Sequence, residues 1–229
     1  MLCSDPGHPV MPHLKLWSEE LNEHEVEIVA SKNELSGGDL LFLISCQEMI
    51  REATKSMYVH TLVIHASDVP KGRGFAPLNW QILEGQSEIV VTMMDAAAKV
   101  DSGDIYHQKT IFNEGHETFE EIFEKLFLAE IELMNFAVQN FDSLDPVRQD
   151  DSVESSYYPR RTSADSRVSV TKSLEEIFDL LRASDPDRYP LTFEHRGYVY
   201  SLKLEKLDRI ELAPMAVVND SADSLRPSQ

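Results

Sequence analysis

Residues 62–74 read LVIHASDVPKGRG, a short apolar run that passes directly into a loop rich in Pro and Gly. Consecutive apolar residues such as Leu62, Val63 and Ile64 are typical of a strand buried on both faces. His65 stands where that strand ends. Because ligands of open α/β sheets bind beyond the carboxyl ends of the strands, His65 is a candidate ligand-facing residue. The alternative is a buried histidine with a purely structural role.

Similar patterns flank this segment on both sides. Residues 40–44 form a second apolar run, and residues 89–94 and 105–111 are further strand candidates. Helical spacing of apolar residues covers residues 13–23, and residues 47–55 also read as a short helix. Apolar runs that alternate with helical segments predict an α/β fold with a parallel sheet.

The second half of the chain carries clear helix starts. Thr118 and Glu121 form a capping box ahead of an apolar helix face, and Ser173 and Glu176 repeat the signature. Arg196-Gly197 lies between two strand candidates and predicts a hairpin. We therefore expect an α/β domain over residues 1–141, a linker over 142–172, a small α+β subdomain over 173–213 and a disordered tail over 214–229.

Composition excludes several classes of function. The 229 residues include 40 Asp and Glu but only 21 Lys and Arg, giving a formal net charge of −19. Nucleic-acid affinity depends largely on cations that replace counterions, so we expect no nucleic-acid partner. No apolar run approaches the ~20 residues of a bilayer span, and no signal peptide pattern opens the chain, which predicts a cytoplasmic protein without a membrane partner. The two cysteines and the spacing of the histidines predict no metal site.

Several motifs around His65 occur together in one family. They are His65-Ala66-Ser67, Val69-Pro70-Lys71-Gly72-Arg73-Gly74, Ala76-Pro77 and Asp101-Ser102-Gly103-Asp104, with Glu84-Gly85 and Val91-Thr92 in register between them. This set resembles the folate-dependent formyltransferase family, which shares the catalytic core of methionyl-tRNA formyltransferase. The similarity covers residues 38–131. It implies a Rossmann-like, mostly parallel sheet and a catalytic domain over residues 1–141.

The resemblance also implies the chemistry. His65 and Asp101, 36 residues apart, match the two catalytic positions. His65 would deprotonate the attacking amine or stabilise the oxyanion, and Asp101 would orient His65 and relay the proton. The implied co-substrate is N10-formyltetrahydrofolate, without a metal. Its expected contacts are Ser45, Cys46, Gln47, Met49, Ile50, Ala97, Val100 and Asp101.

One position departs from the family pattern. The family's asparagine two residues before the histidine is Val63 here, so an amide donor to the formyl oxygen is missing. Loss of one such donor can cost ~100- to 1,000-fold in rate. Ser67 and Asn79, which are nearby in sequence, are candidates to replace it.

The acceptor is inferred from the segment after residue 156. Residues 157–162 with Asp165 resemble the sugar N-formyltransferase branch, which acts on nucleotide-linked amino sugars. Candidate contacts for that acceptor are His8, Lys71, Arg73, Gly74, Pro77, Arg160 and Arg161. Acidic residues outnumber basic ones in residues 141–229, unlike the basic domain that a tRNA enzyme needs.

Several alternatives stay open from sequence. The chain is alternatively a catalytically silent module that binds folate or a sugar nucleotide, a formyltetrahydrofolate hydrolase, or a methionyl-tRNA enzyme. A solvated charge pair is the alternative for Arg160 and Arg161. A homodimer through residues after 170 is a further option.

Overall fold

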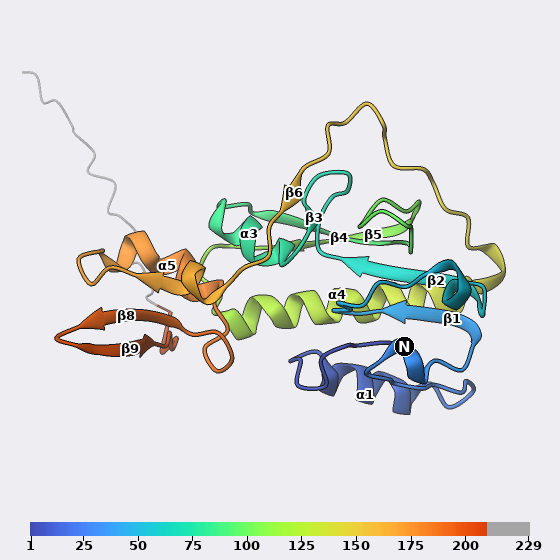
Figure 1. Cartoon of the computed structure of the whole chain (residues 1–229), viewed down its shortest axis with the longest axis horizontal. Helices are drawn as coiled ribbons and strands as arrows, with labels where there is room; N and C mark the ends of the chain where they lie inside the picture. The colour runs from blue at the N-terminus through green and yellow to red at the C-terminus, as the bar shows by residue number, and fades with distance from the viewer. Residues whose placement is uncertain (210–229) are drawn as a thin grey trace, which may run out of the picture.

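The computed structural model describes residues 1–209 (Figure 1). The predicted tail over 214–229, and the last residues of the predicted subdomain, lie outside the described residues. In chain order the helices and strands are α1 (Met11–Glu20), β1 (Gly38–Leu43), α2 (Glu52–Lys55), β2 (Tyr58–His65), β3 (Arg73–Gly74), α3 (Pro77–Leu83), β4 (Glu88–Asp95), β5 (Ile105–Phe112), α4 (Phe119–Gln139), β6 (Tyr157–Tyr158), β7 (Arg167–Val168), α5 (Leu174–Arg182), β8 (Leu191–His195) and β9 (Tyr198–Leu202).

The main sheet has the strand order β1-β2-β4-β5. β1 and β2 run parallel, with Leu43 opposite Val63, and Leu2 extends this side through isolated parallel bridges to Val29 and Leu43. β4 pairs antiparallel with both β2 and β5, and Thr92 lies opposite His65. The predicted α/β class is therefore confirmed, while the parallel pairing is confined to the β1 side, so the main sheet is mixed rather than mostly parallel.

Strand residues alternate between two different surroundings, as the pleat requires. One face packs against α1 and α4 and forms the larger apolar core, which includes Ile44 just after β1 and, from β1, β2 and β4, Phe42, Leu62, Ile64, Ile89, Val91 and Met93. The other face carries a smaller apolar cluster, in which Leu41 and Leu43 pack with Ile50, Ala96 and Val63. His65 follows Val63 on this second face, because the two residues are two positions apart.

The helices follow their local signals with one clear difference. Thr118 caps α4 by accepting a hydrogen bond from the Glu121 amide, while Glu121 accepts one from the Thr118 amide, as the capping box predicts. The helix predicted over residues 47–55 is confined to α2. Residues 45–50 instead form an irregular loop, which begins at Ser45 in the left-handed conformation with φ of 48°.

The C-terminal part adds a second sheet and a helix. β7, β8 and β9 form a three-stranded sheet whose β8–β9 hairpin turns at Arg196-Gly197, as predicted. β7 and β6 both fall within residues 142–172, and β6 pairs with β3 of the first domain. The segment predicted as a linker therefore runs back across the domain before it reaches α5, as Figure 1 shows. In residues 1–209, no helix has the length and apolar character that a bilayer crossing requires.

Candidate functional site

His65 and Asp101, which the sequence predicted as a pair, lie together at the carboxyl end of β2. The His65 Nε2 atom is 3.5 Å from Asp101 Oδ2, and both side chains are about nine-tenths buried. His65 Nε2 is also 2.9 Å from the carbonyl oxygen of Gly72. A carbonyl only accepts hydrogen bonds, so this contact places the imidazole proton on Nε2. In the neutral ring Nδ1 is then the nitrogen with a free lone pair.

Backbone contacts hold Asp101 in place. Its Oδ2 atom accepts a hydrogen bond from the Gly74 amide at 2.8 Å, so a residue of the His65 loop orients the carboxylate. Asp101 itself has φ of 48°. A Cβ added to Gly103 would lie 1.8 Å from the Asp95 carbonyl oxygen, so the loop approaches β4 as closely as only glycine permits.

Backbone strain gathers around this pair. Among residues 1–209, the non-glycine residues with positive φ are Ser45, Ala76, Asp101 and Arg196. The first three lie in the segments that the sequence predicted as folate-binding, acceptor-binding and catalytic. Such conformations persist only where the surroundings impose them, and they concentrate at functional sites.

The two oxyanion candidates occupy different surroundings. Ser67 is buried and its carbonyl accepts a hydrogen bond from the Thr92 hydroxyl, while its own Oγ finds no partner among the described residues. Asn79 donates to the carbonyl of Ala183 at 2.6 Å. Its amide therefore serves the contact between α3 and the end of α5, and only Ser67 keeps a free polar group near His65.

The predicted folate segments form two loops that border the smaller apolar cluster. In the first loop Ile50 and Cys46 pack against that cluster, whereas Met49 is 51% exposed. The Ser4 hydroxyl accepts a hydrogen bond from the Gln47 amide at 2.7 Å and donates one to the Ser45 carbonyl at 3.3 Å. In the second loop Ala97 is half-buried and Val100 is 42% exposed.

His8 joins this region from the N-terminal loop. Its Nε2 atom is 3.2 Å from the Ser45 hydroxyl, and its Nδ1 atom accepts a hydrogen bond from the Val10 amide. Burial is the main cause that lowers the pKa of His8, and the nearby Arg188 guanidinium acts in the same direction. His8 is therefore held neutral beside the first predicted folate loop.

The predicted acceptor residues separate into two groups. Arg160 is exposed, its guanidinium lies 4.5 Å from the centroid of the Phe75 ring, and it donates to the Gln47 side chain at 3.1 Å. Arg161 points elsewhere: it lies over Trp80 and donates to the carbonyl of Asp165 and the hydroxyl of Ser166. Arg160 thus faces the predicted folate loop, while Arg161 stabilises the chain around Asp165 and Ser166.

The remaining acceptor candidates differ in exposure. Lys71 is exposed, and Pro77 is half-buried at the start of α3. The half-buried Gly74 uses its amide to bind Asp101. Arg73 is 8% exposed and donates to the Tyr157 hydroxyl and the Gln149 side chain, so its guanidinium is buried and already engaged by protein groups.

Gln149 is the residue of this site that was not singled out from sequence. Gln149 is buried between Arg73 and the Asp101 loop, and Lys99 lies 5.5 Å from the centroid of the Tyr157 ring. Hydrogen bonds from Lys99 and then Arg73 lower the pKa of the Tyr157 phenol. Among residues 1–209, no group of three or more His, Cys, Asp and Glu side chains is arranged to hold a metal ion.

Known proteins resemble this chain in sequence and in fold. Methionyl-tRNA formyltransferase of Lactobacillus gasseri is 30% identical over 137 residues, which are 58% of this chain and 43% of that protein. The chain thus spans less than half the length of the curated relatives it matches first.

Solved structures extend the likeness in fold. Methionyl-tRNA formyltransferase from Clostridium thermocellum superposes with a TM-score of 0.74 at 21% identity, covering 87% of this chain and 89% of that one. HypX from Aquifex aeolicus in complex with tetrahydrofolic acid superposes with a TM-score of 0.71 at 20% identity, covering 89% of this chain and 36% of that one. A sugar N-formyltransferase from a Shewanella species superposes with a TM-score of 0.61 at 18% identity, covering 75% of this chain and 71% of that one.

A family model described as formyl transferase covers the part of the chain that carries the main sheet and both candidate catalytic residues. The match runs over residues 3–138, which is more than half of the sequence. The chain belongs to the formyl transferase family.

Proposed function

We propose that the chain transfers a formyl group from N10-formyltetrahydrofolate to the amine of a nucleotide-linked amino sugar. The observation that carries the proposal is the meeting of His65 and Asp101, 3.5 Å apart, at the end of β2. In the reaction a bond forms between the amine nitrogen and the formyl carbon. The bond from that carbon to N10 breaks, and one proton passes from the amine to N10.

The hydrogen bonds of His65 suggest its part in the proton transfer. Because Nε2–H is held by the Gly72 carbonyl, Nδ1 is the nitrogen that accepts the amine proton. The imidazolium formed in this way is stabilised by the carboxylate of Asp101, which the Gly74 amide keeps in position. The same ring can return the proton to the leaving N10 atom.

Stabilisation of the oxyanion needs a donor other than residue 63. Val63 packs with the smaller apolar cluster and offers no polar group. The charged form of His65 and the free hydroxyl of Ser67 are the candidates that remain. We therefore expect Ser67→Ala to lower turnover, and Val63→Asn to raise it by restoring the donor that the family pattern holds at this position.

On the acceptor side, Arg160 is the proposed contact for the nucleotide. It is exposed, stacks on Phe75 and reaches Gln47 in the predicted folate loop. Arginine offers a planar set of donors that matches a phosphate. Arg161 is assigned a supporting role because Trp80 and Ser166 already engage it.

The test is an assay with N10-formyltetrahydrofolate and a panel of UDP- and dTDP-linked amino sugars, read by the mass of the product. We expect one sugar to gain a formyl group, and His65→Ala and Asp101→Ala each to abolish transfer while the fold is kept. His195→Ala, an exposed histidine on β8, serves as the matched control. Near-normal turnover in either site variant would remove the assignment.

Other outcomes of the same assay identify the alternatives. Formate release without any sugar indicates a hydrolase, and tight folate binding without any turnover indicates a silent module. Methionyl-tRNA is the second candidate acceptor, favoured by the identity to the Lactobacillus gasseri enzyme. Formylation of charged initiator tRNA at physiological salt would support that acceptor over the sugar.

A further inference from the structure

Residues 147–156, referred to here as the strap, cross both loops that carry the candidate catalytic residues. At one end Val147 forms an antiparallel bridge with Ile105, with N–O distances of 2.7 and 2.8 Å. At the other end Ser156 accepts hydrogen bonds from the Gly72 and Arg73 amides. Figure 1 shows this segment returning from the end of α4 to β6 on the side of the sheet that holds β3. The strap therefore connects the Asp101 loop to the His65 loop.

Gln149 is the residue of the strap that points inward. It is 7% exposed, whereas the neighbouring Arg148 side chain is 79% exposed. Its Nε2 atom donates to the carbonyl oxygen of Asp101 at 3.0 Å and to that of Gly103 at 2.8 Å. Its Oε1 atom accepts a hydrogen bond from Arg73 at 2.5 Å. One amide thus contacts both catalytic loops at once.

The contacts require a group that both accepts and donates hydrogen bonds, and the Gln149 amide does so. Arg73 offers only donors and the two carbonyls offer only acceptors, so the group between them must accept on one side and donate on the other. A carboxylate satisfies Arg73 but repels the carbonyls, and an apolar side chain satisfies neither. Arg73 has no carboxylate partner among the described residues, and its Nε atom is buried without any hydrogen bond. The Gln149 oxygen is therefore a main support of this guanidinium.

We propose that Gln149 is a positioning residue, which ties Arg73 to the backbone of Asp101 and Gly103 and so fixes the Asp101 carboxylate beside His65. The Asp101 backbone is in the left-handed conformation, which a non-glycine residue does not adopt without support from its surroundings. The role rests on the proposed function, because it concerns the same catalytic pair. Gln149 itself touches neither His65 nor the reacting atoms.

The test compares Gln149→Glu, Gln149→Met and the matched control Arg148→Gln in steady-state formyl transfer from N10-formyltetrahydrofolate. A displacement of about 1 Å at a catalytic group can cost ~100-fold in rate, so we expect kcat to fall about 10- to 100-fold in both Gln149 variants. KM for the formyl donor should change little, and Arg148→Gln should match the wild type. A kcat close to that of the wild type in Gln149→Glu would overturn the proposal, even if Gln149→Met fails to fold.

Hydrogen exchange gives a readout that does not depend on the acceptor. The amides of residues 101–104 and of Gly74 should exchange faster in the Gln149 variants, while those of α4 keep their protection. Faster exchange throughout the domain would mean a general loss of stability and would overturn the positioning role. If the wild type formylates no acceptor, the proposed function fails, and exchange confined to residues 101–104 and Gly74 still decides whether Gln149 holds the loop.

Discussion

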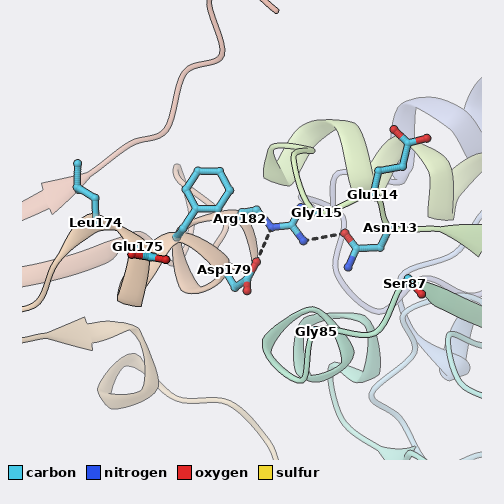
Figure 2. A pocket seen from close by; sticks show the side chains of 10 residues that line it. Gly85, Ser87, Asn113, Glu114, Gly115, Leu174, Glu175, Asp179 and Arg182 are labelled. Carbon is cyan, nitrogen blue, oxygen red and sulfur yellow. Dashed lines mark hydrogen bonds and ion pairs between the residues drawn. The ribbon is translucent and has the colours of Figure 1, made fainter. Parts of the chain in front are cut away.

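Arg182 is the residue whose substitution should most weaken the attachment of α5 to the main domain. It is 1% exposed and lies at the wall of a cavity of about 500 Å³ between α5 and the loops after α3 and β5. Figure 2 shows its guanidinium directed between Asn113 and Asp179. The guanidinium donates to Asn113 Oδ1 at 2.7 Å, to Asp179 Oδ1 at 2.9 Å, and to the carbonyl and carboxylate of Glu117 at 3.1 and 3.3 Å.

The decrease in the free energy of unfolding caused by Arg182→Met depends on which hydrogen-bond acceptors lose their donors. The Glu117 carboxylate keeps Lys125 and the amides of Glu114 and Gly115, so it is not left unpaired. The loss should therefore be smaller than the ~3–5 kcal/mol expected when a buried ion is orphaned. Asn113 Oδ1 and the Glu117 carbonyl do lose a buried donor, at about 1–3 kcal/mol for each unsatisfied group. Two such groups give about 2–6 kcal/mol, and because no ion is orphaned we expect a loss in the lower part of this range, about 2–4 kcal/mol.

The assay is urea denaturation at pH 7, which gives the free energy of unfolding and its dependence on urea for each variant. The control is Arg167→Met, which removes an exposed ion pair with Glu194 at 3.2 Å and should cost at most ~1 kcal/mol. Equal losses for the two arginines, or a loss below about 1 kcal/mol for Arg182→Met, would refute the reasoning from buried acceptors.

Three further outcomes are expected. Burial raises the pKa of Glu130 to about 8, so the folded protein keeps a proton that the unfolded chain releases above pH ~4.5. The free energy of unfolding therefore falls as the pH rises from ~4.5 towards 8. In urea titrations Glu130→Met should raise it by roughly 2–5 kcal/mol at pH 8 and by less at pH 5. Burial raises the pKa of Glu117, but the Lys125 hydrogen bond and backbone amides outweigh it and bring the pKa to about 2. Its contribution to stability is therefore present above pH ~4.5 and lost between pH ~4.5 and 2, and Glu117→Gln should flatten acid unfolding measured by circular dichroism. Gly103→Ala places a methyl group 1.8 Å from the Asp95 carbonyl oxygen, so formyl transfer should fall by more than ~100-fold, and full activity would contradict the role of this loop.

Features that depend on neighbours in sequence could be predicted from the sequence. The capping boxes at Thr118 and Ser173 involve a residue and its third neighbour, so the pattern alone places both helix starts. The turn at Arg196-Gly197 is local in the same way. His65 and Asp101 are far apart in the chain, and only the likeness of their motifs to a family brought them together before the fold was known.

Features that depend on distant contacts could not be predicted in this way. Nothing near Gln149 in the sequence distinguishes it from a solvated linker residue, because its partners Arg73 and Asp101 lie 76 and 48 positions away. The direction of β4 is a similar case, since an apolar run looks the same in parallel and antiparallel pairing. The loop over residues 45–50 has helix-forming residues, but contacts from Ser4 and Arg160 hold it in an irregular path.

The distribution of charge bears on the choice of acceptor. A tRNA would have to replace counterions at many phosphates, and a chain with a net charge of −19 offers few cations for that purpose. Near the candidate site Arg73 is buried behind Tyr157, and Lys99 lies against the same ring. Arg160, exposed on Phe75, and the exposed Lys71 are thus left as candidate cations that a ligand can reach. One such cation beside an aromatic ring suits the short phosphate group and flat base of a nucleotide, which is why charge favours the sugar nucleotide over the longer polyanion.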